Sequence, residues 1–216
     1  METSRPRVIL SAAASIDGKI STRTGDSKMS SKKDTARLHK IRSRVDAILV
    51  GKNTVLVDDP LLTVRYAKGK NPVRIVLDSN GAIPSGSKII KTADSVPTII
   101  AVSRLATKKN QRRLAKHNVQ VIVSGQGRVD VKKLLGILKK QGINTILAEG
   151  GGTLNWELLR LGLVDELILT VTPYLVGGQR SITLIDGTGF SKIRNSKKLK
   201  LHKVSRQKNE VVLHYI

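Results

Sequence analysis

Short apolar runs rich in Ile and Val alternate with longer amphipathic stretches through the first three quarters of this chain. The runs that we interpret as strands are 7–13, 46–50, 73–78, 98–102, 119–123 and 145–148. The stretches that we interpret as helices are 31–44, 104–117, 131–141 and 153–161. Such an alternation is typical of a mostly parallel sheet flanked by helices, so we predict an α/β fold.

The last quarter of the chain has a different pattern. Its apolar runs, at 166–175, 181–185, 199–204 and 211–216, predict strands with no long helix between them, and Asn209 lies in a predicted hairpin turn. We therefore expect the sheet to become antiparallel at one edge. Because we find no internal repeat and no long linker, we expect residues 1–216 to form a single domain.

Composition excludes several kinds of chemistry. The chain has no cysteine, which excludes disulfides, thiolate catalysis and cysteine-ligated zinc. Its 4 histidines do not cluster with carboxylates at ligand spacing, so we expect no metal site. No apolar stretch approaches the ~20 residues that span a bilayer, and the N-terminus lacks a secretory pattern. We expect a cytoplasmic protein with no membrane contact.

The chain is strongly basic, with 39 Lys and Arg against 16 Asp and Glu and a formal net charge of +23. Such a charge favours nucleic acid as a partner. However, the sequence has no zinc-finger spacing, and its 1 Trp, 3 Tyr and 1 Phe offer few surfaces on which bases could stack. A solvated basic surface is the simpler interpretation, and non-specific nucleic-acid binding stays open as an alternative.

A segment at 51–65, GKNTVLVDDPLLTVR, follows the strand expected at 46–50. We expect it to leave that strand through a polar turn that presents Thr54, the adjacent acids Asp58 and Asp59, and Arg65. Ligands of open α/β sheets bind at the carboxyl ends of strands, so we predict a ligand site here. The two neighbouring acids should diverge, so that one binds a ligand while the other fixes the turn.

A second segment, Glu-Gly-Gly-Gly-Thr at 149–153, follows the strand at 145–148 and opens a predicted helix. Glycines at a helix start let backbone amides approach an anion, and Thr153 adds a hydroxyl donor. A tight strand-to-helix turn is the alternative explanation. Glu149 can accept hydrogen bonds from a substrate or help to move a proton, although a surface or capping acid fits its position equally well.

Other polar residues carry weaker signals. Asp17-Gly18 favours a simple turn, with Lys19 pointing toward a ligand as the alternative. Ser30 lies just before the helix expected at 31–44, where capping is the default role, and Arg42 lies within that helix, where solvation is the default.

Several segments together resemble the reductase of riboflavin biosynthesis. They are SAAASIDGKI (11–20), DSKMSS (26–31), HKIRSRVDAILVGKNTVLVDDPLLTVR (39–65), RIVLDSNGAIP (74–84), ILAEGGGTLNWELLRLGLVDEL (146–167) and TPYLVGG (172–178). The resemblance spans nearly the whole chain in order and is greatest to the free-standing archaeal and fungal type. Bacterial relatives fuse this domain to a zinc deaminase, whose histidine-glutamate motif and cysteines this chain lacks.

The resemblance implies a dihydrofolate-reductase-like fold, with a mostly parallel central sheet, flanking helices and antiparallel C-terminal strands. It implies that NADPH reduces 2,5-diamino-6-ribosylamino-4(3H)-pyrimidinone 5′-phosphate to the ribitylamino product, through ring opening to an imine and hydride transfer to C1′. It also implies a homodimer with the C-terminal strands in its interface. A dihydrofolate-reductase-like enzyme acting on another substrate is a further alternative.

The resemblance also assigns site residues. On the cofactor side it implies Ala13, Thr54, Asp58, Ser79, Gly151, Gly152, Thr153 and Leu154. On the substrate side it implies Ser30, Arg42, Leu62 and Arg65, with the two arginines suited to the phosphate. Lys19 and Glu149 are the candidates for catalytic proton handling. Bacterial relatives often carry a tryptophan near positions 28–29, which are Lys and Met here.

Overall fold

A computed structural model describes residues 3–216, which fall into two compact units. The first unit takes in the described residues through Arg7 together with His39–Leu147. The second unit takes in Val8–Leu38 and Ala148–Ile216. The prediction of a single domain stays a prediction.

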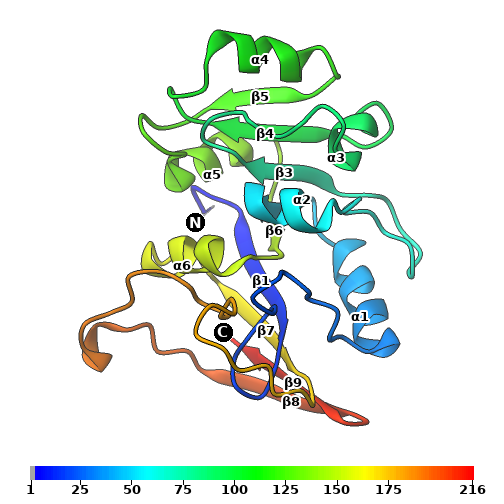
Figure 1. Ribbon diagram of the computed structural model, residues 1–216, viewed down its shortest axis with the longest axis vertical. Helices are drawn as coiled ribbons and strands as arrows, with labels where there is room; N and C mark the ends of the chain where they lie inside the picture. The colour runs from blue at the N-terminus through cyan, green and yellow to red at the C-terminus, as the bar shows by residue number, and fades with distance from the viewer. Residues whose placement is uncertain (1–2) are drawn as a thin grey trace. The chain divides into compact units, whose positions relative to one another are not determined.

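The first unit is built on parallel strands (Figure 1). In spatial order these are β5 (Gln120–Val123), β4 (Thr98–Val102), β3 (Val73–Leu77), β2 (Ala47–Gly51) and β6 (Thr145–Ala148). Its helices are α2 (Lys52–Asp58), α3 (Lys88–Lys91), α4 (Lys108–Ala115) and α5 (Val131–Lys140), while α1 (Lys32–Arg42) begins in the second unit and ends in the first. Each strand therefore ends at the same edge of the sheet, where polar segments follow.

Apolar burial explains these elements. Every residue of β4 is buried, which is expected of a central parallel strand covered on both faces. Helix α5 buries Leu134, Leu135 and Leu138 on one face, at the spacing of an amphipathic helix. Its N-cap is Asp130, whose side chain accepts a hydrogen bond from the Lys133 amide, and Gly142 follows its end with a φ of 86°.

The second unit combines parallel and antiparallel pairing. Strand β1 (Arg7–Ala14) pairs in parallel with β7 (Glu166–Val171), which pairs in antiparallel fashion with β9 (Glu210–Tyr215). Strand β8 (Leu201–Gln207) completes a hairpin with β9 through the predicted turn, where Lys208 has a φ of 55°. Helix α6 (Gly152–Arg160) and a short 3₁₀ helix (Ile193–Asn195) complete the unit. The expected antiparallel C-terminal strands are confirmed.

Two expectations about secondary structure are wrong, and one helix was not predicted. The expected polar turn after β2 is the helix α2, a seven-residue element in which Val55 alone is buried. Helix α3 has no counterpart among the predicted elements. Residues 181–185 do not form a strand, because Thr183 makes only an isolated bridge to Lys19. In the described part of the chain, no helix is long and apolar enough to cross a membrane.

Candidate active site

In the first unit, the predicted site residues of the 51–65 segment lie on α2 and on the loop that follows it. Thr54 lies in the first turn of α2, and Asp58 is its last residue. Desolvation by the surrounding chain raises the pKa of Asp58, although its side chain keeps solvent contact. Asp59 adopts a left-handed conformation, and its Oδ1 accepts a 2.8 Å hydrogen bond from the Lys88 amide at the start of α3. Asp59 thus fixes the turn, which leaves Asp58 as the acid suited to a ligand.

Side chains hold the backbone of the loop 59–65 at several points. The Arg42 guanidinium donates to the Thr63 carbonyl (3.0 Å), and that of Arg74 donates to the Leu61 carbonyl (3.2 Å). The Val64 amide donates to Asn71 (2.8 Å), and the Arg65 amide donates to His39 Nδ1 (2.9 Å). Leu62 is buried within this loop with a φ of 51°. The conformation that presents Leu62 and Arg65 is therefore set before any ligand binds.

His39 lies in a strongly cationic environment. It is only 2% exposed and packs edge-on against Tyr66, with ring centroids 4.8 Å apart. Burial, followed by the charges of Arg42 and Arg65, lowers the pKa of His39 from 6.5 to about 4. The imidazole is therefore neutral at neutral pH, and its Nδ1 can accept the hydrogen bond from the Arg65 amide. Two guanidinium groups influence one side chain, which marks this end of the loop as a region of positive potential.

We expect the stability of the protein to fall as the pH is lowered from about 6.5 to about 4. The unfolded chain protonates His39 near 6.5 and the folded chain only near 4, so the unfolded state binds more protons in this window. The free energy of unfolding should decrease by up to about 1.4 kcal/mol per pH unit. Urea titrations of the wild type and His39→Gln, at pH 7, 5.5 and 4.5, measure this slope. A slope as steep in the variant as in the wild type would remove His39 as its source.

The two arginines assigned to the substrate phosphate differ in accessibility. Arg42 is only 7% exposed, and its Nη1 donates a hydrogen bond to the Thr63 carbonyl. Arg65 is exposed, with its guanidinium carbon 5.7 Å from the centroid of the Tyr66 ring. Arg65 is thus better placed to meet an anion from solvent, whereas Arg42 shapes the loop.

Ser79 follows the end of β3, at the same edge of the sheet as α2. Its hydroxyl oxygen accepts a hydrogen bond from the Val129 amide (3.1 Å), and its carbonyl accepts from the amide and hydroxyl of Ser103 (3.0 and 2.9 Å). Its neighbour Asp78 is buried and accepts from the Ile83 amide (2.8 Å). The backbone at this strand end is fixed, and the Ser79 hydroxyl can still donate to a ligand.

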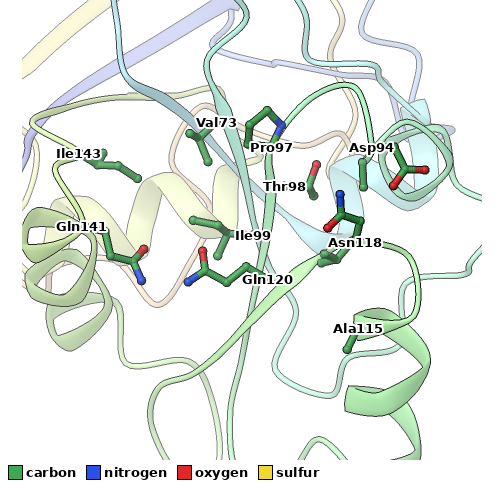
Figure 2. A pocket seen from close by; sticks show the side chains of 12 residues that line it. Val73, Asp94, Pro97, Thr98, Ile99, Ala115, Asn118, Gln120, Gln141 and Ile143 are labelled. Atoms are coloured by element: carbon green, nitrogen blue, oxygen red, sulfur yellow. The ribbon is translucent and has the colours of Figure 1, made fainter.

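A cavity of about 630 Å³ in the first unit lies away from these residues (Figure 2). Val73, Thr98 and Gln120, which begin β3, β4 and β5, line it together with Asn118 and Gln141. This is the amino edge of the parallel strands, whereas open α/β sheets bind ligands at the carboxyl edge. The cavity is therefore not the predicted site.

In the second unit, the glycine turn has two distinct features. Gly150 has a φ of 82°, which disfavours any residue with a side chain. Gly152 begins α6, and a Cβ there would lie 2.6 Å from the Thr183 carbonyl oxygen. Backbone conformation thus accounts for Gly150, and close packing accounts for Gly152. Gly151 is the N-cap of α6 and supplies no capping side chain, and Thr153 is exposed in the first turn.

The predicted turn at Asp17-Gly18 is confirmed, with Gly18 at a φ of 79°. The Asp17 carboxylate accepts hydrogen bonds from the Ser15 hydroxyl (2.7 Å) and the amides of Val176 (3.0 Å) and Gly177 (2.7 Å). These bonds, the Ser15 hydroxyl first, lower the pKa of Asp17 to about 2. Asp17 therefore holds the turn that presents Lys19, a role that we did not predict.

Residues 181–186 connect the Lys19 turn with the glycine turn. The backbone of Lys19 pairs with that of Thr183 in an isolated antiparallel β-bridge, and Lys19 Nζ donates a hydrogen bond to the Ser181 carbonyl (3.4 Å). The Asp186 amide donates a hydrogen bond to the Gly152 carbonyl (3.1 Å), and the Asn155 side-chain amide donates one to the Leu184 carbonyl (2.8 Å). The segment 181–186 thus contacts both the turn that carries Lys19 and the glycine turn at 149–153. These contacts explain why it does not join the sheet.

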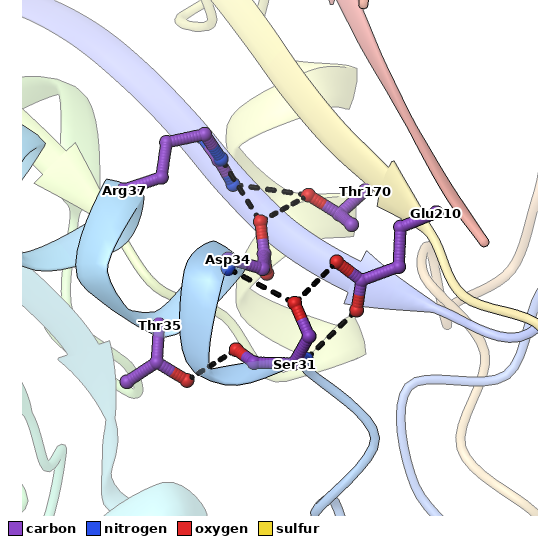
Figure 3. A network of polar contacts seen from close by, with 6 residues as sticks. All are labelled: Ser31, Asp34, Thr35, Arg37, Thr170 and Glu210. Atoms are coloured by element: carbon purple, nitrogen blue, oxygen red, sulfur yellow. Dashed lines mark hydrogen bonds and ion pairs between the residues drawn. The ribbon is translucent and has the colours of Figure 1, made fainter. Parts of the chain in front are cut away.

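A polar network, with Asp34, Thr170 and Glu210 buried, fixes the chain just after Ser30 (Figure 3). The amide and hydroxyl of Ser31 donate to the two carboxylate oxygens of Glu210 (2.7 and 2.6 Å). The Ser31 hydroxyl also accepts a hydrogen bond from the Asp34 amide, so Ser31 caps the N-terminus of α1. Asp34 in turn accepts from Arg37 (2.9 Å) and from the Thr170 hydroxyl (2.7 Å). Ser30 itself is exposed beside this anchored residue.

The candidate residues divide between the two units. The first unit carries Arg42, Thr54, Asp58, Leu62, Arg65 and Ser79, and the second carries Ala13, Lys19, Ser30, Glu149, Gly151, Gly152, Thr153 and Leu154. Among the described residues, no group of three His, Asp or Glu side chains could hold a metal ion. The supporting residues Asp17, His39, Arg74 and Glu210 were not predicted. For Asp17 and Arg74, a charged side chain inside a turn-forming or apolar segment is the sequence signal that could have found them.

The architecture is that of the dihydrofolate-reductase-like α/β enzymes. Dihydrofolate reductase from Enterococcus faecalis, solved with NADP(H), has this fold, with a TM-score of 0.53 at 14% identity over 97% of this chain and 95% of that one. The riboflavin biosynthesis reductase of Saccharomyces cerevisiae gives a TM-score of 0.76 at 26% identity, over 100% of this chain and 91% of that one.

The chain belongs to the RibD C-terminal domain family, which it matches over residues 6–213. It is 42% identical to the 2,5-diamino-6-ribosylamino-4(3H)-pyrimidinone 5′-phosphate reductase of Methanothermobacter thermautotrophicus, over 98% of each chain. The predicted family and the predicted fold class are thus confirmed.

Proposed function

We propose that this chain uses NADPH to reduce the ribosyl side chain of 2,5-diamino-6-ribosylamino-4(3H)-pyrimidinone 5′-phosphate to the ribitylamino product. Its family and its full-length relatives make it an oxidoreductase of the pyrimidine reductase step of riboflavin biosynthesis. The fold class implies a nicotinamide cofactor. NADPH as the preferred form, the residue roles and a homodimer are parts of the proposal.

The second unit offers features that fit a dinucleotide. The start of α6 has a glycine N-cap without a capping side chain and an exposed threonine hydroxyl, which suit a pyrophosphate. Asn155 is fully buried beside Gly150, and its Oδ1 has no hydrogen-bond partner among the described residues. Our cofactor assignments in this unit are Gly151, Gly152, Thr153 and Leu154, and those in the first unit are Thr54, Asp58 and Ser79.

The observation that best supports a phosphorylated substrate is the cationic end of the loop 59–65. The charges of Arg42 and Arg65 both act on His39, and the exposed Arg65 guanidinium can bind phosphate oxygens in a fork. The loop is already fixed by His39, Arg42, Asn71 and Arg74, so little conformational entropy is lost on binding. Leu62 and Ser30 are the remaining residues that we assign to the substrate.

When bound, the nicotinamide supplies a hydride. Hydride addition at C1′ of an open-chain imine requires a proton at the imine nitrogen. Lys19 Nζ and the Glu149 carboxyl are our candidates to hold or deliver that proton. Lys19 is oriented by the Asp17 turn and by Ser181, and Glu149 follows the buried strand β6. The protein otherwise contributes position and electrostatics.

The direct test follows NADPH absorbance with the purified chain and the ribosylamino pyrimidine phosphate, and repeats the assay with NADH and with dihydrofolate. We expect saturable oxidation of NADPH with the pyrimidine, a lower rate with NADH, and none with dihydrofolate. Equal turnover of NADH would refute the cofactor preference. No oxidation of either nucleotide would refute the proposal as a whole.

A further inference from the structure

Arg74 is a charged residue in the middle of an apolar core. It lies on β3 within the sequence Val-Arg-Ile-Val-Leu, and its side chain is 0% exposed. Burial lowers the pKa of Arg74 to about 10, so the guanidinium is charged at neutral pH. A buried charge is costly unless hydrogen bonds surround it, so a structure that keeps one needs its donors satisfied.

The guanidinium satisfies its donors with neutral oxygens from four segments of the first unit. Nη1 donates to the Leu61 carbonyl (3.2 Å) and the Thr92 hydroxyl (2.7 Å). Nη2 donates to the carbonyls of Ile89 and Val96 (3.0 Å each), and Nε and Nη2 share the Thr98 hydroxyl (3.0 and 2.6 Å). One planar group thus joins the loop 59–65 to α3, to the residues that follow α3, and to the start of β4.

We propose that Arg74 is a positioning residue for the substrate loop, holding Leu61 so that the backbone at Leu62 and the exposed side chain of Arg65 face the phosphorylated substrate. This inference rests on the proposed function, which assigns Leu62 and Arg65 to the substrate. Leu62 requires such support because its left-handed φ of 51° is unfavourable for a branched side chain. The Nη1 bond to Leu61 fixes the residue before this strained position, and the Arg42 bond to Thr63 fixes the residue after it.

Two variants separate this role from general stability. Arg74→Lys keeps the charge but loses the fork whose Nη1 reaches Leu61 while Nη2 holds Ile89 and Val96. Thr92→Val is milder, because it leaves Arg74 in place and removes only a hydroxyl, which accepts from Nη1 and donates to the Lys88 carbonyl. Arg113→Lys is the matched control, since Arg113 also donates to a backbone carbonyl of this unit, that of Gly81 (2.7 Å), but does not contact the loop.

Amide hydrogen exchange of the ligand-free protein is the first measurement. In Arg74→Lys and Thr92→Val we expect exchange in residues 61–66 to rise at least about tenfold, while β3 and β4 stay protected. Arg113→Lys should leave this loop unchanged. If Arg74→Lys does not fold, Thr92→Val decides alone. Wild-type exchange in the loop of every folded variant, or equal loosening in Arg113→Lys, would overturn the proposal.

Steady-state kinetics are the second measurement. We expect the KM for the pyrimidine phosphate to rise about tenfold in the two test variants, with the KM for NADPH and kcat changed less than about threefold. A loosened loop with an unchanged substrate KM would overturn the positioning role and identify the substrate assignment of Leu62 and Arg65 as the error. Exchange needs no substrate, so it tests the loop contact even if the proposed reaction is wrong.

Discussion

Replacing Glu149 with Gln is expected to lower kcat about 100-fold while leaving the fold intact, which is the usual size of a lost proton-transfer group. Glu149 follows directly after β6, whose last three residues are buried, so its backbone position is fixed by the sheet. Gln has nearly the same shape and keeps one carbonyl acceptor, but it cannot carry a proton between substrate and solvent. Stopped-flow or steady-state NADPH oxidation with the pyrimidine phosphate measures the loss.

The matched control is Glu157→Gln on α6. That carboxylate is paired with Arg160 at 2.6 Å and has no assigned role in the reaction. We expect its kcat to stay within about twofold of the wild type, and circular dichroism to show the same helix content for both variants. Unchanged kinetics in Glu149→Gln would remove Glu149 from the reaction. Equal losses in the two variants would point to a general effect on α6.

Arg65→Ala is expected to raise the KM for the pyrimidine phosphate about 30-fold while kcat changes little. Hydrogen bonds to a charged group contribute about 1.5–3 kcal/mol, which corresponds to roughly 10- to 150-fold in binding. The phosphate is remote from the reacting carbon, so Arg65 should stabilise the ground state and the transition state equally. Arg65→Lys should recover part of the loss, because it restores the charge without the fork.

Arg112→Ala provides the comparison, since Arg112 is an exposed arginine of the same unit on α4. It lowers the net charge by the same amount and should leave both Michaelis constants unchanged. An effect of Arg65→Ala confined to the KM for NADPH would assign the guanidinium to the cofactor. Equal effects of the two variants would mean that overall charge, and not a specific contact, attracts the substrate.

The sequence predicted the main elements because apolar periodicity determined them. The buried runs at β3, β4 and β6 and the leucine face of α5 can be recognised without coordinates. Helix α2 could not, because Thr54, Val55 and Val57 are β-branched and only Val55 is buried, so both propensity and periodicity are weak. Residues 181–185 alternate like a strand, but their hydrogen bonds go to the Lys19 turn and to α6.

The site was predictable only in part. Resemblance to a family suggested which residues bind ligands. It did not suggest the residues that hold those ligand-binding residues in place. Arg74 and His39 act on backbone atoms of Leu61 and Arg65, which lie 13 and 26 positions away in the chain. Patterns of side chains contain little information about contacts with a distant carbonyl or amide. A charge in an apolar strand nevertheless indicates that such a partner exists.

The bond between Ser31 and Glu210 has a consequence for how the protein matures. Glu210 lies close to the end of the chain, at the first position of the final strand, yet it anchors the residue next to Ser30. During synthesis Ser31 emerges about 180 residues before Glu210, so this anchor forms only after β9 has emerged. A polypeptide that stops before Glu210 lacks this anchor, so the backbone beside Ser30 is fixed only after β9 has been made.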